Sequence, residues 1–167
     1  MLRAAGGVDL NQKVALVPAK SASKVVYYAT ILHAHNLKVA ALLDSDSAGD
    51  QAAKQDVLVH VLGNKRIIRT KDAYAGSVTA PEIEDLLRDT LVTLAKASLG
   101  WDIEAVAQAQ ATRPIVDIFT AEIGDFSKYK LAKAYVRWTR DHDASGLSEI
   151  EATAWKKLIE SVNSALK

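Results

Sequence analysis

The stretch Lys38-Val-Ala-Ala-Leu-Leu-Asp44-Ser-Asp46-Ser-Ala-Gly49 carries the most structural information in this chain. Five apolar residues in succession run into two aspartates separated by one serine. A short apolar segment between polar residues is typical of a strand buried on both faces, as in a parallel sheet covered by helices. Ligands of open α/β sheets bind beyond the carboxyl ends of the strands, so Asp44 and Asp46 are expected at a functional site. Residues two apart project to the same side of an extended chain, and paired carboxylates suit Mg²⁺ or Mn²⁺.

The sequence around this stretch predicts alternating strands and helices. We expect strands at 14–17, 39–43 and 66–70, and helices at 24–35 and 48–62. Ser21 or Ser23 supplies the N-cap of the first helix. This strand–helix–strand–helix–strand order implies a small parallel sheet with right-handed crossovers.

The character of the chain changes after residue 78. Thr79-Ala-Pro-Glu82 opens a helix that runs to about Ser98 and ends at Gly100, and Ser148 with Glu151 form a capping box for the last helix. Further helices are expected near 102–111, 114–123, 127–141 and 149–166. The fold class is therefore α/β, with a core of alternating strands and helices over 1–78 and an all-helical subdomain over 79–167 that continues the same unit.

Composition limits the classes of protein to which the chain can belong. Its 167 residues are 49% hydrophobic and 25% charged, with a net charge of +1, which fits an ordinary globular chain with one sizeable core. The balanced charge means that nucleic-acid binding requires a local basic patch. No cysteine is present, which excludes disulfides and fits a cytoplasmic protein, and no apolar stretch reaches the roughly 20 residues that span a bilayer.

The first residues suggest a longer parent polypeptide. Leu2-Arg-Ala-Ala-Gly-Gly7 resembles the end of a helix with its terminating glycines, and no beginning of that helix is visible. We therefore expect the chain to be a fragment. The alternative is a short disordered N-terminus.

The aspartate pair has three competing interpretations. Asp44-Ser-Asp46-Ser-Ala-Gly49-Asp50 resembles the start of an EF-hand loop, but Ala48 and Gln55 stand where that loop needs oxygen ligands. An aspartyl-phosphate phosphatase also places two aspartates after a strand, usually the first one. In the third interpretation, Asp46 only caps the following helix, which leaves Asp44 unexplained.

A second acidic group follows at Glu82-Ile-Glu84-Asp85. At helical spacing Glu82 and Asp85 share a face, so they are candidate metal ligands. Thr79 and Glu82 are also spaced as a capping box, and on sequence alone the two roles of Glu82 are equally plausible. Lys128 opens a basic helix; it is either a solvated side chain or a cation that stabilises the charge of a phosphoryl transition state.

These motifs together resemble the Toprim domain, and the fuller pattern resembles the C-terminal half of OLD-family (overcoming lysogenization defect) nucleases. The resemblance covers about residues 2–140. The matching pieces are Val14-Ala-Leu-Val-Pro18, Lys24-Val25, Leu42-Leu-Asp44-Ser-Asp46-Ser-Ala-Gly49, Glu82-Ile-Glu84-Asp85-Leu-Leu87 and Phe126-Ser-Lys128-Tyr-Lys130-Leu-Ala132.

The resemblance implies a metal-dependent DNA endonuclease joined to an ABC-type ATPase in the parent polypeptide. Asp44 and Asp46 would bind one Mg²⁺ or Mn²⁺ ion, Glu82 and Asp85 would complete a second site, and Lys128 would approach the scissile phosphate. In such a site one ion activates the attacking water and the other stabilises the leaving oxygen.

The chain departs from the family pattern at its beginning. Toprim domains start with a strand that ends in glutamate, whereas only Asp9 precedes Asp44 as an acidic residue here. Two rivals to the nuclease follow from this. One is a catalytically silent Toprim-like module that binds metal, a partner or nucleic acid without cutting it. The other is a different Toprim enzyme, either one that uses Tyr27, Tyr28 or Tyr74, or a primase.

Overall fold

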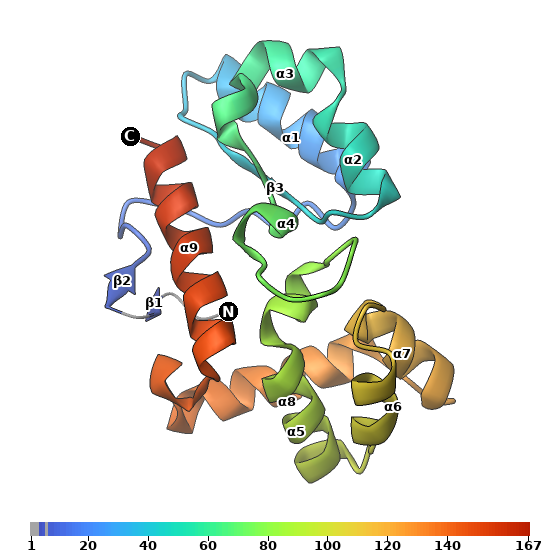
Figure 1. The fold of residues 1–167 in the computed structure, drawn as a ribbon. Coiled ribbons are helices and arrows are strands. Elements are labelled where there is room, and N and C mark those ends of the chain that lie inside the picture. The colour runs from blue at the N-terminus through green and yellow to red at the C-terminus, as the bar shows by residue number, and fades with distance from the viewer. Residues whose placement is uncertain (1–3, 6) are drawn as a thin grey trace.

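A computed structural model describes residues 4–5 and 7–167 (Figure 1). Helices dominate, and the strands are short. The elements are β1 Ala4–Ala5, β2 Val8–Asp9, α1 Ala22–Ala34, β3 Ala41–Leu43, α2 Ser47–Ala53, α3 Asp56–Leu62, η1 Asn64–Arg66, β4 Ile67–Arg69, α4 Thr70–Ala73, η2 Ile83–Leu87, α5 Arg88–Leu99, α6 Glu104–Ala109, α7 Ile115–Glu122, α8 Lys128–Asp141, η3 Ala144–Gly146 and α9 Glu149–Ala165.

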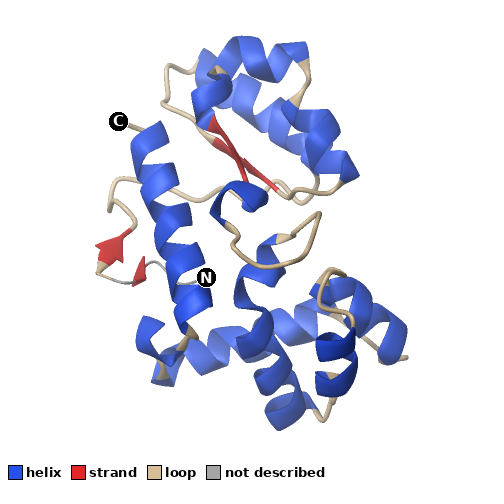
Figure 2. Cartoon of the chain, viewed as in Figure 1, coloured by secondary structure: helices blue, strands red, loops and turns tan. Residues whose placement is uncertain are grey.

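The sheet at the centre of the α/β half is a parallel pair, β3 and β4, in which Leu42 is the register partner of Ile68. Figure 2 shows this pair lying beneath α1, α2 and α3. The chain is thus α/β with a small parallel sheet and flanking helices, as predicted, and its two strands lie within the expected segments 39–43 and 66–70. Its likeness to a Toprim sheet stays a prediction.

Alternate residues of β3 pack into two different hydrophobic clusters. Ala41 and Leu43 are buried with Val26 of α1 and Leu58 of α3, in a cluster confined to residues 22–67. Leu42 packs on the opposite side, against the larger cluster that α5, α7, α8 and α9 build. The strand is therefore covered on both faces, which explains why it contains no polar residue.

Two expected elements differ from the structure. Residues 14–17 form no strand, and Leu16 and Val17 are 52% and 54% exposed, because no neighbouring strand of the described residues pairs with this segment. The helix expected over 48–62 is broken at Gln55, whose backbone is extended, and the two short helices α2 and α3 each pack against α1.

The beginning of the chain also differs from the expectation. Ala4–Ala5 pair with Val8–Asp9 as an antiparallel ladder, so these residues do not end a helix. Residues 1–3 and 6, the rest of the expected helix tail, lie outside the described residues.

Helix boundaries in the second half follow the local sequence signals. Gly100, with φ of 70°, ends α5 in the left-handed conformation that glycine favours. Ser148 and Glu151 form the expected capping box of α9. The expected Thr79–Glu82 box is absent, because the segment begins instead as η2, where the Asp85 carboxylate accepts a hydrogen bond from the Glu82 amide.

Helix α9 connects the helical half to the α/β half. It packs against β1, β2 and α4 (Figure 1), while Glu151 at its start accepts hydrogen bonds from the Thr90 amide and hydroxyl at 2.9 and 2.7 Å. The larger cluster also takes in Leu10 and Ile68 from the α/β half. A division into two parts at residue 78 stays a prediction, and side chains from both sides of it share one core.

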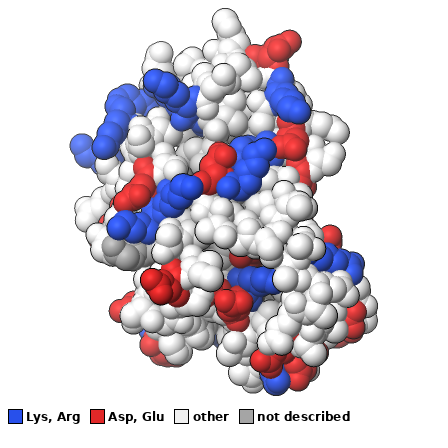
Figure 3. All heavy atoms as spheres, viewed as in Figure 1, with Lys and Arg blue, Asp and Glu red and all other residues white. Residues whose placement is uncertain are grey.

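The surface carries no large field of one sign on the face shown in Figure 3, where acidic and basic side chains are interspersed. This agrees with the net charge of +1. Among the helices of the described residues, none has the length and apolarity needed to cross a membrane.

Candidate functional site

The two aspartates follow β3 directly, at the carboxyl end of the parallel pair. Asp44 is half-buried, and its Oδ1 accepts a hydrogen bond from the Ile83 amide at 2.9 Å. Asp46 is the N-cap of α2, where its Oδ1 accepts from the Gly49 amide at 2.7 Å. Capping therefore occupies one oxygen of Asp46, whereas Asp44 joins two segments that are 39 residues apart in the sequence.

Gly49 allows the tight turn that carries this pair. A Cβ atom at this position would overlap the carbonyl oxygen of Asp44. Only glycine lets the first turn of α2 approach the end of β3 so closely. The glycine that follows the aspartates is thus required by packing at the turn.

A buried hydroxyl network fastens this turn to two other loops. The Ser45 amide donates to the Pro81 carbonyl at 3.0 Å, and its hydroxyl bonds with Thr70 Oγ1 at 3.0 Å and the Lys71 amide at 2.9 Å. Thr70 Oγ1 also donates to the Pro81 carbonyl. Ser45 and Thr70 are 5% and 0% exposed, so these bonds are made away from water and hold the loops after β3 and β4 and the 80–82 segment in fixed positions.

Glu82 and Glu84 approach the aspartates from the start of η2. The Lys128 ammonium at the start of α8 lies 3.3 Å from Glu82 Oε2 and 3.0 Å from Glu84 Oε1. Both glutamates are largely buried, with side chains 20% and 18% exposed. We call Asp44, Asp46, Glu82 and Glu84 the acidic cluster, and Lys128 is the cation that contacts it.

The acidic cluster is electrostatically strained. Burial raises the pKa of Asp44, the hydrogen bond from Ile83 opposes that rise, and the Glu84 charge adds to it. Burial also raises the pKa of Glu82, although Lys128 acts in the opposite direction. Burial alone would lower the pKa of Lys128, but the Glu84 and Glu82 carboxylates raise it above its usual value. A further cation near Asp44 and Glu82 would stabilise their charged forms.

The donor atoms of the cluster suit a hard divalent cation. All are carboxylate oxygens, the ligands that Mg²⁺ and Mn²⁺ prefer. Glu84 Oε2 is buried without a hydrogen-bond partner, so one ligand atom is desolvated and uncommitted. Within the described part of the chain, no three His, Cys, Asp or Glu side chains are already arranged around one ion position. Cation binding would therefore require side-chain movements, including that of Lys128.

Asp85 makes its side-chain contacts outside the acidic cluster. Its side chain is fully buried, Oδ1 accepts from the Ile115 amide at 2.8 Å, and Oδ2 accepts from the Glu82 amide at 2.9 Å. Arg88 Nη1 lies 3.4 Å from Oδ1. Burial raises the pKa of Asp85, and these backbone hydrogen bonds limit the rise. The carboxylate thus anchors η2 to α7, and both of its oxygens are occupied.

The structure places Asp44 and Asp46 at the end of β3, places Glu82 and Glu84 in contact with Lys128, and turns Asp85 toward α7; the role of these side chains as metal ligands stays a prediction. The helical-spacing argument that paired Glu82 with Asp85 fails because Glu82 precedes η2 with an extended backbone, φ −89° and ψ 172°. Glu84 lies inside η2, and no spacing in the sequence distinguished it from Asp85. Nothing in the sequence marked Ser45 or Thr70.

Arg69 supports the same region from β4. Its Nη2 donates to the Asp44 carbonyl at 2.6 Å, and its Nη1 lies 2.8 Å from Asp50 Oδ1. The side chain is 9% exposed, so it acts as an internal brace between the ends of the two strands and α2.

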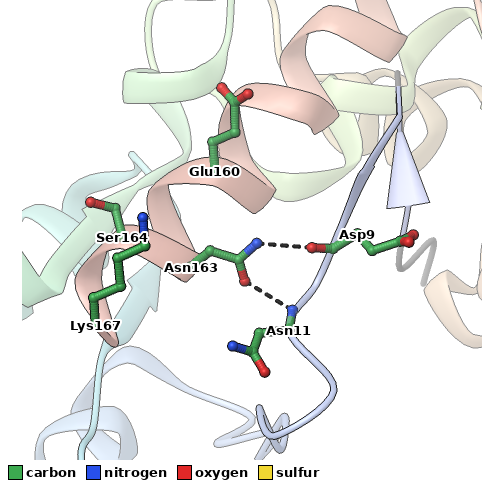
Figure 4. Close-up of a pocket in the computed structure, with 6 residues that line it drawn as sticks. All are labelled: Asp9, Asn11, Glu160, Asn163, Ser164 and Lys167. Carbon is green, nitrogen blue, oxygen red and sulfur yellow. Dashed lines mark hydrogen bonds between the residues drawn. The ribbon is translucent and has the colours of Figure 1, made fainter.

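A separate polar hollow of about 590 Å³ lies where α9 meets the segment after β2 (Figure 4). There the Asn163 amide donates to the Asp9 carbonyl at 2.8 Å and accepts from the Asn11 amide at 2.9 Å. These bonds fasten the 9–11 segment to α9. The hollow shares no lining residue with the acidic cluster.

Comparisons of the chain with protein-family models, with curated proteins and with solved structures found no significant match.

Proposed function

We propose that this chain is the metal-binding part of a phosphodiesterase that cuts DNA, of the OLD-type Toprim class which its motifs resemble. The observation that carries the proposal is the meeting of Asp44, Glu82, Glu84 and Lys128, from three distant segments, at the carboxyl end of a parallel strand. Fold alone would not identify a nuclease. Hard oxygen donors can hold the ions that activate water, and a lysine can stabilise the charge that develops on the phosphate.

Asp44, Glu82 and Glu84 form the ligand set for one Mg²⁺ or Mn²⁺ ion. When bound, such an ion lowers the pKa of a water molecule and neutralises charge on the phosphate. The hydrogen bond from Ile83 orients Asp44, and the uncommitted Glu84 Oε2 faces no competing donor. With Asp46 capping α2 and Asp85 committed to backbone amides, a second ion of the kind that the resemblance implies stays a prediction.

Lys128 has two roles in this proposal. Without a divalent cation it neutralises Glu82 and Glu84, which otherwise would repel each other. Its raised pKa keeps it protonated near neutral pH. Released from the glutamates, the ammonium would pair with a nonbridging phosphate oxygen as water attacks phosphorus and one P–O bond breaks. The reaction consumes one water and yields a phosphomonoester and an alcohol.

The proposal predicts Mn²⁺-dependent nicking of supercoiled plasmid. We expect Asp44→Asn, Glu84→Gln and Lys128→Ala each to lower the nicking rate by about 100-fold or more, the range of a lost electrostatic or acid–base group. Gel electrophoresis of time courses with Mn²⁺ and with EDTA measures the rates. Glu160→Gln, which alters an exposed carboxylate of α9, is the matched control and should keep the parental rate.

Metal binding is measured in parallel so that binding and cutting are separated. Mn²⁺ should raise the melting temperature of the parent and of Glu160→Gln, but not of Asp44→Asn, because a ligand that binds only the folded state stabilises it. Equal nicking by the parent and all variants would exclude the acidic cluster as the site. Stabilisation by Mn²⁺ without nicking would favour a silent metal-binding module.

A DNA substrate, an ATPase in the same polypeptide and a cytoplasmic location belong to the same proposal. They follow from the resemblance and from the lack of cysteine, and each needs its own test.

A further inference from the structure

A groove of about 390 Å³ runs between α5 and α8, on the part of α8 that leads away from Lys128. Its floor is apolar, with Leu94 of α5 and Ala134 of α8 both buried. Its rim is basic and aromatic, formed by Lys130, Lys133, Arg137, Trp138 and His142. We call this the α5–α8 groove. No role in the proposed chemistry has been assigned to it.

The cations of the groove lie on one face of α8. Lys130, Lys133 and Arg137 are spaced three and four residues apart, so they succeed each other along the helix at intervals of one turn, about 5 Å. Lys130 is paired with Asp125 at 3.0 Å. Throughout the described residues, no carboxylate lies within ion-pairing distance of Lys133 or Arg137. One carboxylate, Asp141, lines the groove at its far end.

The aromatic end of the groove is a preformed stack. The Trp138 and His142 rings are nearly parallel, 7° apart in plane with centroids separated by 4.5 Å, and Tyr135 stacks beside Trp138 at 5.8 Å. A hydrogen bond of 3.0 Å between His142 Nδ1 and the Trp138 carbonyl fixes the imidazole in this position. His142 is exposed, and thus the stack ends at the surface.

We propose that the α5–α8 groove binds single-stranded nucleic acid, with phosphates on Lys133 and Arg137 and a base against the aromatic end. Unpaired cations at regular intervals attract a polyanion, and aromatic rings supply a sequence-tolerant stacking platform. An acidic peptide would use the cations but would gain nothing from the stack. For its biological purpose this inference rests on the proposed function. It deepens that function because α8 leads from the groove to Lys128 and the acidic cluster.

Fluorescence polarisation with a labelled oligothymidylate tests the inference in EDTA, where no cutting occurs. Lys133→Gln/Arg137→Gln should weaken binding by at least about tenfold. It should also make the slope of log K against log salt shallower by about 1.4, since each single-strand phosphate contact contributes about 0.7. Lys156→Gln/Lys157→Gln, which removes two exposed lysines of α9, is the matched control and should bind within about twofold of the parent.

The aromatic contribution is tested separately with His142→Ala. Binding of oligothymidylate should weaken about fivefold, the lower end of the range for one stacked base, while binding of inorganic polyphosphate stays unchanged. The inference is overturned by a lack of oligothymidylate binding, by an equal loss of binding in Lys133→Gln/Arg137→Gln and Lys156→Gln/Lys157→Gln, or by polyglutamate or AMP competing as well as the oligonucleotide. Oligothymidylate binding without plasmid nicking would reject the nuclease and keep the groove. Plasmid nicking together with unchanged oligothymidylate binding by Lys133→Gln/Arg137→Gln would reject the groove and keep the nuclease.

Discussion

At the scale of single residues, the acidic cluster lowers the stability of the fold, because it holds charged groups away from water. Asp44 is half-buried beside other carboxylates, and its pKa is raised mainly by burial. A carboxyl group whose pKa is higher in the folded than in the unfolded state binds more protons when folded. The free energy of unfolding therefore falls as the pH rises through the region above 3.8, and the loss is complete above the folded pKa.

Asp44→Asn should accordingly stabilise the protein at neutral pH in the presence of EDTA. The asparagine oxygen can still accept the Ile83 hydrogen bond, while the buried charge is gone. We expect a gain of about 1 kcal/mol, or about 2–4 °C in melting temperature for a chain of this size. Thermal unfolding followed by circular dichroism between pH 4 and pH 7 measures it. The gain should shrink toward pH 4, and Glu160→Gln should show no such trend; a destabilised Asn variant at pH 7 would contradict the account.

At the scale of elements, the end of β3 and the beginning of α2 form one unit. Three kinds of contact hold it: the Asp46 cap, the Ser45 hydroxyl network, and the close approach of Gly49 to the Asp44 carbonyl. None of them depends on the charge of Asp44. The position of the aspartate pair is therefore set by packing and capping.

Gly49→Ala tests this unit. The new methyl group would meet backbone oxygen, which cannot move aside as a side chain can, so we expect a loss of about 3 kcal/mol in the free energy of unfolding. Urea denaturation gives the value. Gly124→Ala is the matched control, because a Cβ there would meet open space and the residue is outside the left-handed region. It should change stability by less than about 1 kcal/mol. Equal effects of the two substitutions would show that the close approach is not rigid.

Local sequence signals predict a helix or strand correctly where an interaction between residues near in sequence decides whether it forms. The strands β3 and β4 lie within the expected segments 39–43 and 66–70, and Ser21 and Ser148 are the N-cap residues of α1 and α9. The run at 14–17 is equally apolar, but a strand needs a partner, and pairing is a property of the assembled sheet. In the same way, Asp85 does not belong to the acidic cluster, because the Ile115 amide, 30 residues away, donates a hydrogen bond to its Oδ1. Spacing in the sequence contains no information about that contact.

At the scale of the whole molecule, the two hydrophobic clusters differ in size. The cluster around Val26, Leu43 and Leu58 involves only elements between residues 22 and 67. The larger one draws side chains from α5 to α9 and from both sides of residue 78. A smaller buried area gives a lower free energy of local opening, since less apolar surface is exposed when the unit unfolds.

Hydrogen exchange should therefore distinguish the two regions. We expect slowly exchanging amides of α1 and α3 to exchange about 30-fold faster than those of α5 and α9, which corresponds to about 2 kcal/mol in opening free energy. Exchange followed by mass spectrometry in native conditions measures this. Leu58→Ala should accelerate exchange in α1 and α3 alone, while Ile118→Ala, at an equally buried position of α7, should act on the larger region. Identical opening energies throughout would indicate a single cooperative unit.

The short segment from Glu82 to Asp85 has a consequence for how this sequence can diverge. Its neighbouring carboxylates serve opposite sides of the backbone, with Glu82 and Glu84 toward Lys128 and Asp85 toward α7. Adding or deleting one residue between them would exchange these partners and disturb both sides together. In evolution this segment should tolerate substitution but not a change of length, so gaps in an alignment of relatives belong in the exposed loop at 75–77 and not between 82 and 88.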